Sequence, residues 1–269
     1  MPEGHTLFRL AREQSELFAG RPVHVTSPQG RFAAGAALLD GRVPEEVTSY
    51  GKHLFADFGG PVLHVHLGLY GTYTTGRGDP PPPRGALRMR WTADGPDGEG
   101  VWTDLRGATA CDVLTRPEVD AILDRLGPDP LRTRRGGPLS HARVARSRTA
   151  VGALLMDQSV LAGVGNVYRA EILFRHRISP FRPGRDVGEA EWLVLWDDLV
   201  RLMRAGVRMG RIVTTEPADR SRRSGTVRRE DAHYVYRRTG LPCRLCGTEV
   251  RTEEMVGRNL HWCPTCQAV

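Results

Sequence analysis

The last 27 residues carry the feature that most constrains this fold. Four of the five cysteines lie there as two pairs, Cys243-x-x-Cys246 and Cys263-x-x-Cys266, with 16 residues between them. Paired cysteines at this spacing are typical of a tetrahedral Zn²⁺ site. Four thiolates leave no position for water, so we expect one structural zinc ion. Two disulfides or free thiols in a core are the alternatives, and the absence of a secretory pattern disfavours the disulfides.

The segment between the two cysteine pairs reads as a short β-hairpin. Residues 248–256 and 259–262 can pair as strands, with Gly257-Arg258-Asn259 at the tip. Such a hairpin would present Arg258 as a fixed, permanently charged fork suited to a phosphate group.

In the rest of the chain the predicted secondary structure changes at about residue 118, from mainly strands to helices. Apolar residues at helical spacing predict a helix over residues 3–18, and short β-branched runs between Gly- and Pro-rich turns predict antiparallel sheets up to Thr115. These runs include residues 62–67, 87–92 and 101–105, while 79–83, Asp followed by four prolines, predicts an exposed loop.

Beyond Pro117 the pattern is helical. It predicts helices over 118–126, 150–158, 166–176 and 189–206, a linker at 127–140 and a polar, Arg-rich loop at 216–231. We therefore expect three domains, spanning residues 1–118, 119–215 and 216–269.

Charge and hydropathy narrow the choice of partner and compartment. The formal net charge of +7 favours a polyanion, although an arginine-rich composition alone could give the same excess. No apolar run approaches membrane-spanning length, and the opening residues lack a secretory pattern. We expect no membrane partner, a monomer, and a cytoplasmic site of action close to the nucleoid.

The glycine-rich turn at 162–165 precedes Asn166, where a helix is predicted to begin. Asn is a favoured N-cap, and a helix start with exposed amides is a ready phosphate site. An ordinary helix-turn-helix corner without a ligand is the alternative, and the local pattern alone slightly favours it.

Lys52 is the only lysine in the chain, and Pro2 follows the initiator methionine. A lysine ammonium can hold and pass a proton, which a guanidinium cannot. Removal of Met1 would leave Pro2 as a secondary amine that is partly neutral at pH 7 and can attack C1′ of a deoxyribose, with Glu3 beside it as a proton donor. Chance codon usage and an ordinary helix start remain the alternatives.

Taken together, four motifs in order resemble the formamidopyrimidine-DNA glycosylase and endonuclease VIII family over nearly the whole chain. They are the opening Pro2-Glu3-Gly4-His5-Thr6, the Gly51–Phe55 stretch, the Gly163–Asn166 turn and the terminal finger with Arg258. The resemblance implies an α+β multidomain fold: an N-terminal helix plus antiparallel β-sandwich, a helical helix-two-turn-helix domain and a C-terminal β-hairpin zinc finger.

The resemblance also implies roles by matching position. Pro2 is the expected Schiff-base nucleophile, Glu3 the proton donor for base excision, Lys52 the proton donor of the lyase step and Arg258 the δ-elimination residue. We favour Arg258 as a phosphate clamp, because its pKa is too high for an acid.

Four further residues are expected to contact DNA. Asn166 matches a phosphate-binding asparagine and Arg125 a DNA-contacting arginine, while Leu69 and Tyr70 look like a wedge that fills the gap left by a flipped base. Where the endonuclease VIII branch often has a polar side chain before this pair, the chain has Gly68.

The opening motif and the Leu-Tyr pair resemble the endonuclease VIII branch, especially its actinobacterial forms. The resemblance therefore implies a bifunctional DNA glycosylase and AP lyase of base excision repair, acting on double-stranded DNA with oxidised pyrimidines or abasic sites, through β,δ-elimination. The alternatives are a non-catalytic zinc protein that binds DNA damage, and an 8-oxoguanine or formamidopyrimidine glycosylase of the same fold.

Overall fold

The computed structural model describes residues 2–95 and 97–268, so Met1, whose removal the chemistry of Pro2 requires, lies outside the described residues. The chain divides into two compact units, Met1–Arg125 and Leu126–Val269. Each unit is described by itself below. The division into three domains, with boundaries after residues 118 and 215, stays a prediction.

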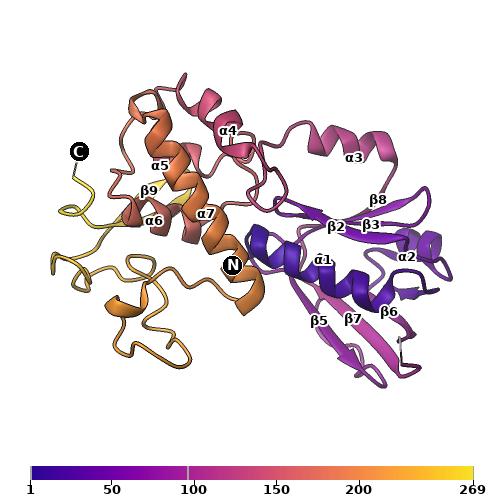
Figure 1. Cartoon of the computed structure of the whole chain (residues 1–269). Helices are drawn as coiled ribbons and strands as arrows, with labels where there is room; N and C mark the ends of the chain where they lie inside the picture. Colours follow the sequence, from indigo (N-terminus) through magenta and orange to yellow (C-terminus); the bar gives the residue numbers. More distant parts are fainter. Residues whose placement is uncertain (1, 96, 269) are drawn as a thin grey trace. The chain divides into compact units, whose positions relative to one another are not determined.

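The first unit is a helix packed on two antiparallel sheets (Figure 1). One sheet has the strand order β1-β6-β7-β5 and the other β2-β3-β4-β8. The elements in chain order are α1 (Gly4–Phe18), β1 (His24–Thr26), α2 (Ala33–Leu39), β2 (Glu46–Tyr50), β3 (His53–Asp57), β4 (Val62–His66), β5 (Thr72–Arg77), β6 (Leu87–Asp94), β7 (Gly100–Arg106), β8 (Ala110–Leu114) and α3 (Arg116–Leu123). The predicted N-terminal helix and β-sandwich are confirmed.

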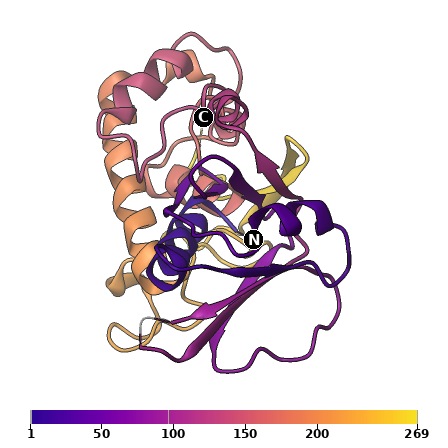
Figure 2. The ribbon, with the colours of Figure 1, turned by 90° about the vertical axis from the view of Figure 1, so that its right-hand side faces the viewer.

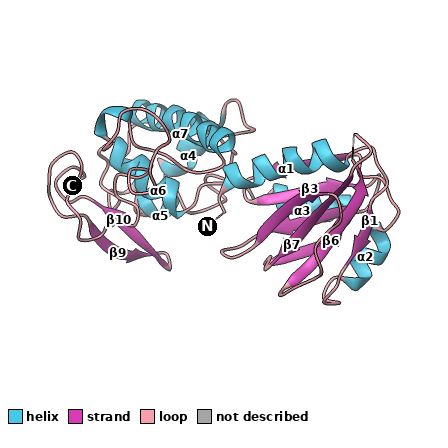
Figure 3. Ribbon diagram, turned by 90° about the horizontal axis from the view of Figure 1, so that it is seen from below, coloured by secondary structure: helices cyan, strands magenta, loops and turns pink. Residues whose placement is uncertain are grey.

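The core of the first unit explains why α1 forms. Leu7, Leu10 and Phe18 recur at helical spacing, and all three are buried in a cluster shared with both sheets. Phe18 meets Trp91 of β6 edge to face, with ring centroids 5.6 Å apart. Figure 3 shows α1 running alongside the sandwich. The helix thereby holds its own first turn, and with it Glu3, against the sheets.

Helix α2 was not predicted, because its residues fall inside a stretch that otherwise reads as strands. Its sequence, Ala-Ala-Gly-Ala-Ala-Leu-Leu, combines strong helix formers with two inward positions, Ala36 and Leu39. That alanine run was the missed signal.

The second unit combines helices with a two-stranded hairpin. Its elements are α4 (Gly136–Val144), α5 (Val151–Leu154), α6 (Asn166–Arg175), η1 (Gly184–Asp186), α7 (Glu189–Met209), η2 (Pro217–Asp219), β9 (Arg251–Met255) and β10 (Arg258–Trp262). The long orange helix in Figure 2 is α7, whose buried side chains include Trp192, Leu195 and Leu199. Among the described residues, no helix has both the length and the apolar character needed to cross a bilayer.

Two helices of this unit differ from the sequence prediction. Residues 136–140 were expected at the end of a linker but form the first half of α4, because Gly136 and Gly137 let the helix approach α7 where a Cβ would collide with the Trp196 ring. Residues 150–158 were expected as one helix, yet α5 ends at Leu154. Beyond it the Asp157 and Gln158 side chains bond to nearby backbone groups, which competes with helix formation.

Candidate functional site

The start of α1 holds the predicted nucleophile and acid. Glu3 is the N-cap residue, has extended backbone, accepts the Thr6 N–H at 2.8 Å through its carbonyl and is fully buried. Pro2 precedes it and is partly buried. In the first turn of α1, burial, with help from Arg9, lowers the pKa of His5 to about 4. The imidazole is therefore neutral at pH 7 and adds no charge beside Pro2 and Glu3.

Lys52 lies in the two-residue turn that joins β2 to β3. Gly51, at φ 58°, allows that tight turn, in which Tyr50 pairs directly with His53. Lys52 is half-buried as a residue. The β2–β3 hairpin thus holds the predicted proton donor on a short, rigid turn.

Three histidines lie beside Lys52 on strands β3 and β4. His53 pairs with His66 across the strands, and His53 Nδ1 lies 2.9 Å from His64 Nε2. Burial, followed by the neighbouring imidazoles, Arg125 and Lys52, lowers the pKa of His53 to about 3, and burial lowers that of His64 to about 4. The pKa of His66 is lowered by burial and by Lys52. The cluster is neutral at pH 7.

This cluster predicts a loss of stability in acid. A histidine whose folded pKa lies below 6.5 takes up a proton on unfolding, so its contribution is complete above pH 6.5 and is lost as pH falls toward the folded pKa. Between pH 7 and 5 we expect His53 to cost roughly 2 kcal/mol of unfolding free energy. Urea unfolding should show a steeper decline for the natural protein than for His53→Asn. Parallel declines would contradict the assignment.

The predicted wedge residues occupy the turn between β4 and β5. The turn is closed by a hydrogen bond from the Gly71 N–H to the Leu67 carbonyl, 2.9 Å long. Leu69 is 38% exposed and Tyr70 84% exposed, and Tyr70 is the most exposed large apolar side chain among the described residues. Arg125, predicted to contact DNA, follows α3 and is also exposed, with its Nε donating to the Ala121 carbonyl at 3.0 Å.

In the second unit, Asn166 joins helix α6 to the finger hairpin. Asn166 is the first residue of α6 and Gly165 the N-cap, so the sequence-based assignment of Asn166 as the N-cap was wrong by one position. Its Nδ2 donates to the Asn259 carbonyl at 2.9 Å, and its Oδ1 accepts a bond from Arg169. The start of α6 and the turn end of the hairpin are therefore held together beside Arg258.

Arg258 is the first residue of β10. Val256 and Gly257, both at positive φ, form the turn, and Arg258 pairs with Met255 instead of lying at the very tip as predicted. Its side chain is exposed. A short rigid hairpin thus carries an accessible guanidinium, as the sequence indicates.

The four cysteines of the finger form a metal centre. Their sulfur atoms all lie within 4.8 Å of one another, and the distances are 3.9 Å for Cys243–Cys266 and 3.5 Å for Cys246–Cys263. Tetrahedral zinc with Zn–S bonds of about 2.3 Å requires sulfurs about 3.8 Å apart, so the donor set fits the ion. Gln267 anchors the second knuckle, since its amide accepts the Cys263 N–H and donates to the Ile178 carbonyl.

Zinc removal should release the finger. Structural zinc supplies folding free energy that a hairpin of this size cannot replace, so Cys263→Ser is expected to lose the metal and the fixed position of Arg258. Because a hydrogen bond to a charged group contributes about 1.5–3 kcal/mol, affinity for duplex DNA should fall at least about tenfold. Metal content and DNA affinity are the measurements. Cys111→Ala, outside the finger, should keep one zinc per chain; loss of zinc there would contradict the assignment.

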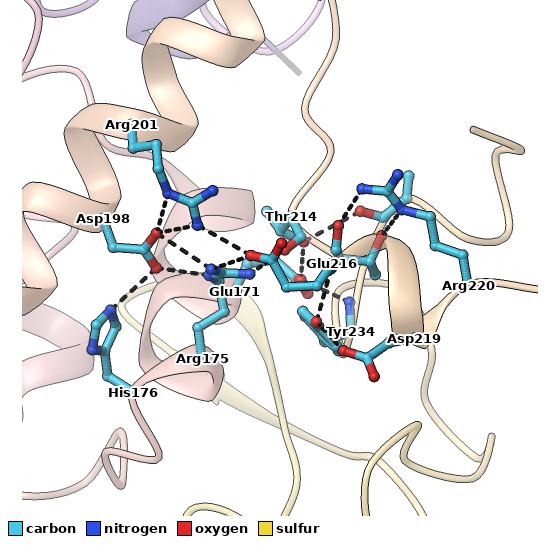
Figure 4. Close-up of polar contacts among 12 residues, drawn as sticks. Glu171, Arg175, His176, Asp198, Arg201, Thr214, Glu216, Asp219, Arg220 and Tyr234 are labelled. Atoms are coloured by element: carbon cyan, nitrogen blue, oxygen red, sulfur yellow. Dashed lines mark hydrogen bonds and ion pairs between the residues drawn. The ribbon is translucent and has the colours of Figure 1, made fainter. Parts of the chain in front are cut away.

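Glu171 holds the segment that leads into the finger, and sequence reasoning missed it. Its carboxylate accepts three successive backbone N–H groups, from Tyr234 at 2.7 Å, Val235 at 2.8 Å and Tyr236 at 2.7 Å. It also accepts a hydrogen bond from the Thr214 hydroxyl (Figure 4). Glu171 is fully buried. The available signal was a carboxylate within the otherwise apolar stretch 170–174, because a buried charge requires dedicated donors.

An ion network continues outward from Glu171 on α6 and α7. Arg175 bonds Asp198 at 2.7 Å and Glu216 at 2.8 Å, and Arg201 reaches the same two carboxylates (Figure 4). Burial alone would raise the pKa of Asp198, but hydrogen bonds from His176 and Arg175 hold it far below its usual range. The network fixes the start of the Arg-rich loop against both helices.

Comparison with known proteins accounts for this arrangement. Three protein-family models match the chain. The family "Formamidopyrimidine-DNA glycosylase N-terminal domain" matches residues 1–111, and the family "Formamidopyrimidine-DNA glycosylase H2TH domain" matches residues 126–217. The family "Zinc finger found in FPG and IleRS" matches residues 240–269. The match to the finger agrees with the four-cysteine centre. A sandwich, an H2TH region and a zinc finger in this order define a class of DNA repair glycosylases.

Similar proteins and solved structures point to the same family as these domain matches. Endonuclease 8 1 of Mycobacterium tuberculosis is 51% identical over 99% of this chain and all of its own length, and the formamidopyrimidine-DNA glycosylase of Thermus thermophilus is 36% identical over 86% and 85%. The chain therefore belongs to the formamidopyrimidine-DNA glycosylase and endonuclease VIII family. A Lactococcus lactis formamidopyrimidine-DNA glycosylase, solved with DNA containing an AP site, shares the fold, with a TM-score of 0.79, 22% identity and coverage of 99% and 100%.

Proposed function

We propose that the protein is a bifunctional DNA glycosylase and AP lyase that uses Pro2 as its nucleophile. The observation that carries this proposal is Pro2-Glu3 at the start of α1, with Glu3 fully buried, in a chain of this repair family that has a single lysine. A buried carboxyl group next to a terminal amine provides both a proton donor and a nucleophile at one place.

The proposed reaction has two stages. After Met1 is removed, the Pro2 nitrogen attacks C1′ of the damaged nucleotide, and the base leaves with the electrons of its bond to C1′ and takes up the proton that the Pro2 nitrogen releases. Glu3 then protonates the sugar ring oxygen as the bond from C1′ to that oxygen breaks and the ring opens to an iminium ion. Loss of a C2′ proton then expels the 3′ phosphate, and a second elimination expels the 5′ phosphate. Water releases the sugar fragment and restores the amine.

Two basic residues serve the elimination stage in this proposal. Lys52 supplies a proton in the lyase step, because an ammonium group can give one up at accessible cost. Arg258 assists the second elimination by holding the departing phosphate through its guanidinium fork.

The proposed partner is double-stranded DNA with a damaged base or an abasic site, bound by a monomer in the cytoplasm. The net charge of +7 attracts the phosphate backbone. Phosphate contacts come from the exposed side chains of Arg125 and Arg258 and from Asn166 at the start of α6. The exposed pair Leu69 and Tyr70 fills the gap in the stack when a nucleotide is flipped out.

Oxidised pyrimidines are the proposed substrates, because the higher identity is to Endonuclease 8 1 and the wedge is a Leu-Tyr pair. Duplexes carrying thymine glycol or 5-hydroxyuracil should be cleaved at least about tenfold faster than 8-oxoguanine opposite cytosine, a difference of about 1.4 kcal/mol. The reverse order would instead support the alternative, a purine-directed glycosylase. Binding without cleavage of any of the three would support the other alternative, a non-catalytic damage binder.

A further inference from the structure

The Arg-rich loop, residues 216–231, carries cations that the protein leaves unpaired. Arg222, Arg223 and Arg229 are exposed, and none of the three forms an ion pair with any residue that the structure describes. Guanidinium forks without carboxylate partners are suited to phosphate groups. The loop therefore offers a phosphate-binding surface, provided that its two ends are held in place.

The two ends of the loop meet at Asp231, which is buried. The Ser221 N–H donates to Asp231 Oδ1 at 3.2 Å, and the Ser221 hydroxyl donates to Oδ2. The Asp231 carbonyl accepts the Thr215 hydroxyl at 2.6 Å. One residue thus ties the segment that enters the loop to the segment that leaves it.

Arg244 of the zinc finger grips the same end of the loop. It lies in the first knuckle, Cys243–Cys246, and its side chain is only 14% exposed. Its guanidinium donates to the His233 carbonyl at 3.1 Å and to Asp231 Oδ1 at 3.3 Å. It also donates to the Glu230 carbonyl. One fork therefore reaches three acceptors within four residues at the exit of the loop.

The metal centre determines where this fork begins. Arg244 lies between Cys243 and Cys246, so zinc held by both cysteines fixes the backbone on either side of it. Hydrogen bonds from the Cys243 N–H to the Thr248 carbonyl at 2.8 Å and from the Gly247 N–H to the Cys243 carbonyl at 3.0 Å close the knuckle. A single side chain thus connects the metal centre to the loop.

We propose that Arg244 couples the zinc centre to the Arg-rich loop and thereby positions the loop arginines on the phosphates of duplex DNA. This inference rests on the duplex partner named in the proposed function. Arg244 is a positioning residue, because it acts through the loop and not through its own contact with DNA.

Proteolysis without DNA tests the grip on the loop. Arg244→Gln removes the charged fork, so trypsin should cut within residues 222–229 at least about tenfold faster than in the natural protein. Asp231→Ala, which leaves the finger intact, should release the loop in the same way. Arg251→Gln is the matched control, because it removes an exposed arginine from the same finger. It should keep the natural rate, and all three variants should keep one zinc per chain.

The salt dependence of binding tests the effect on DNA. The probe is a duplex with a tetrahydrofuran abasic analogue, and each phosphate contact contributes about 0.9 to the slope of log Kd against log salt. Arg244→Gln should lower this slope by roughly 1 to 3. When Arg222, Arg223 and Arg229 have all been changed to Gln, adding Arg244→Gln should lower it no further, since the fork acts only through the loop.

Two outcomes would overturn the proposal. If Arg244→Gln and Asp231→Ala are cut by trypsin at the natural rate, Arg244 does not hold the loop. If Arg244→Gln lowers the slope equally with and without the three loop arginines, it does not act through them. Failure of the proposed function is distinct, because the natural protein would then show no affinity for the duplex while trypsin still detected the released loop.

Discussion

Protein that keeps Met1 should form no covalent adduct with abasic DNA, and its rate of base excision should fall by at least about three orders of magnitude. The reason is that nucleophilic catalysis requires a free electron pair on the attacking nitrogen. In the unprocessed chain the Pro2 nitrogen belongs to an amide, whose electron pair is delocalised into the carbonyl group. Processing by methionine aminopeptidase turns the same atom into a secondary amine that is partly unprotonated at pH 7. The iminium ion formed by a secondary amine is permanently cationic and serves directly as an electron sink.

The two forms can be compared as one polypeptide before and after enzymatic removal of Met1, with mass spectrometry to establish each state. Affinity for duplex DNA should be similar in both, because the phosphate contacts proposed for Asn166 and Arg258 do not involve the terminus. Equal excision by both forms would exclude Pro2 as the nucleophile.

Glu3→Gln should reduce base excision by about 10²- to 10⁴-fold, the range typical of a lost general acid. The amide cannot give a proton to the sugar ring oxygen, whereas cleavage of a preformed abasic site, which needs no base to be expelled, should fall much less. Single-turnover rates on a duplex with 5-hydroxyuracil and on one with an abasic site separate the two effects.

Glu16→Gln is the matched control, because Glu16 is an exposed carboxylate on the same helix whose partner is Arg12 at 3.6 Å. That variant should keep both rates. If Glu3→Gln leaves excision of the damaged base intact, or lowers both reactions equally, Glu3 is not the specific donor for glycosidic cleavage.

Local patterns in the sequence predicted the elements whose stability is local. The spacing of Cys243, Cys246, Cys263 and Cys266 specified the metal centre, and the stripe of Leu7, Leu10 and Phe18 specified α1. In both cases the residues that form the pattern are also the residues that form the element, and they lie close together in the sequence. No contact with a distant part of the chain was needed to predict them.

Several of the features that escaped prediction depend on distant partners. Gly136 and Gly137 read as a linker until the ring of Trp196 is seen to exclude any Cβ there. Glu171 reads as one more charge on a helix until it is found to accept N–H groups more than 60 residues away in the sequence, at Tyr234–Tyr236. The contact between Gly68 and Thr109 likewise joins two loops that no local pattern connects.

The chain offers an unusually direct test of its central chemistry, because it contains only one lysine. After Met1 is removed, the α-amine of Pro2 and the Lys52 ammonium are its only two alkyl amines, and hence the only groups able to form a Schiff base with a sugar aldehyde. The measurement is borohydride reduction of the processed protein on abasic DNA, followed by peptide mapping of the adduct. We predict that the sugar remnant lies on the nitrogen of Pro2; an adduct on Lys52, or no adduct at all while the strand is still cleaved, would contradict the mechanism.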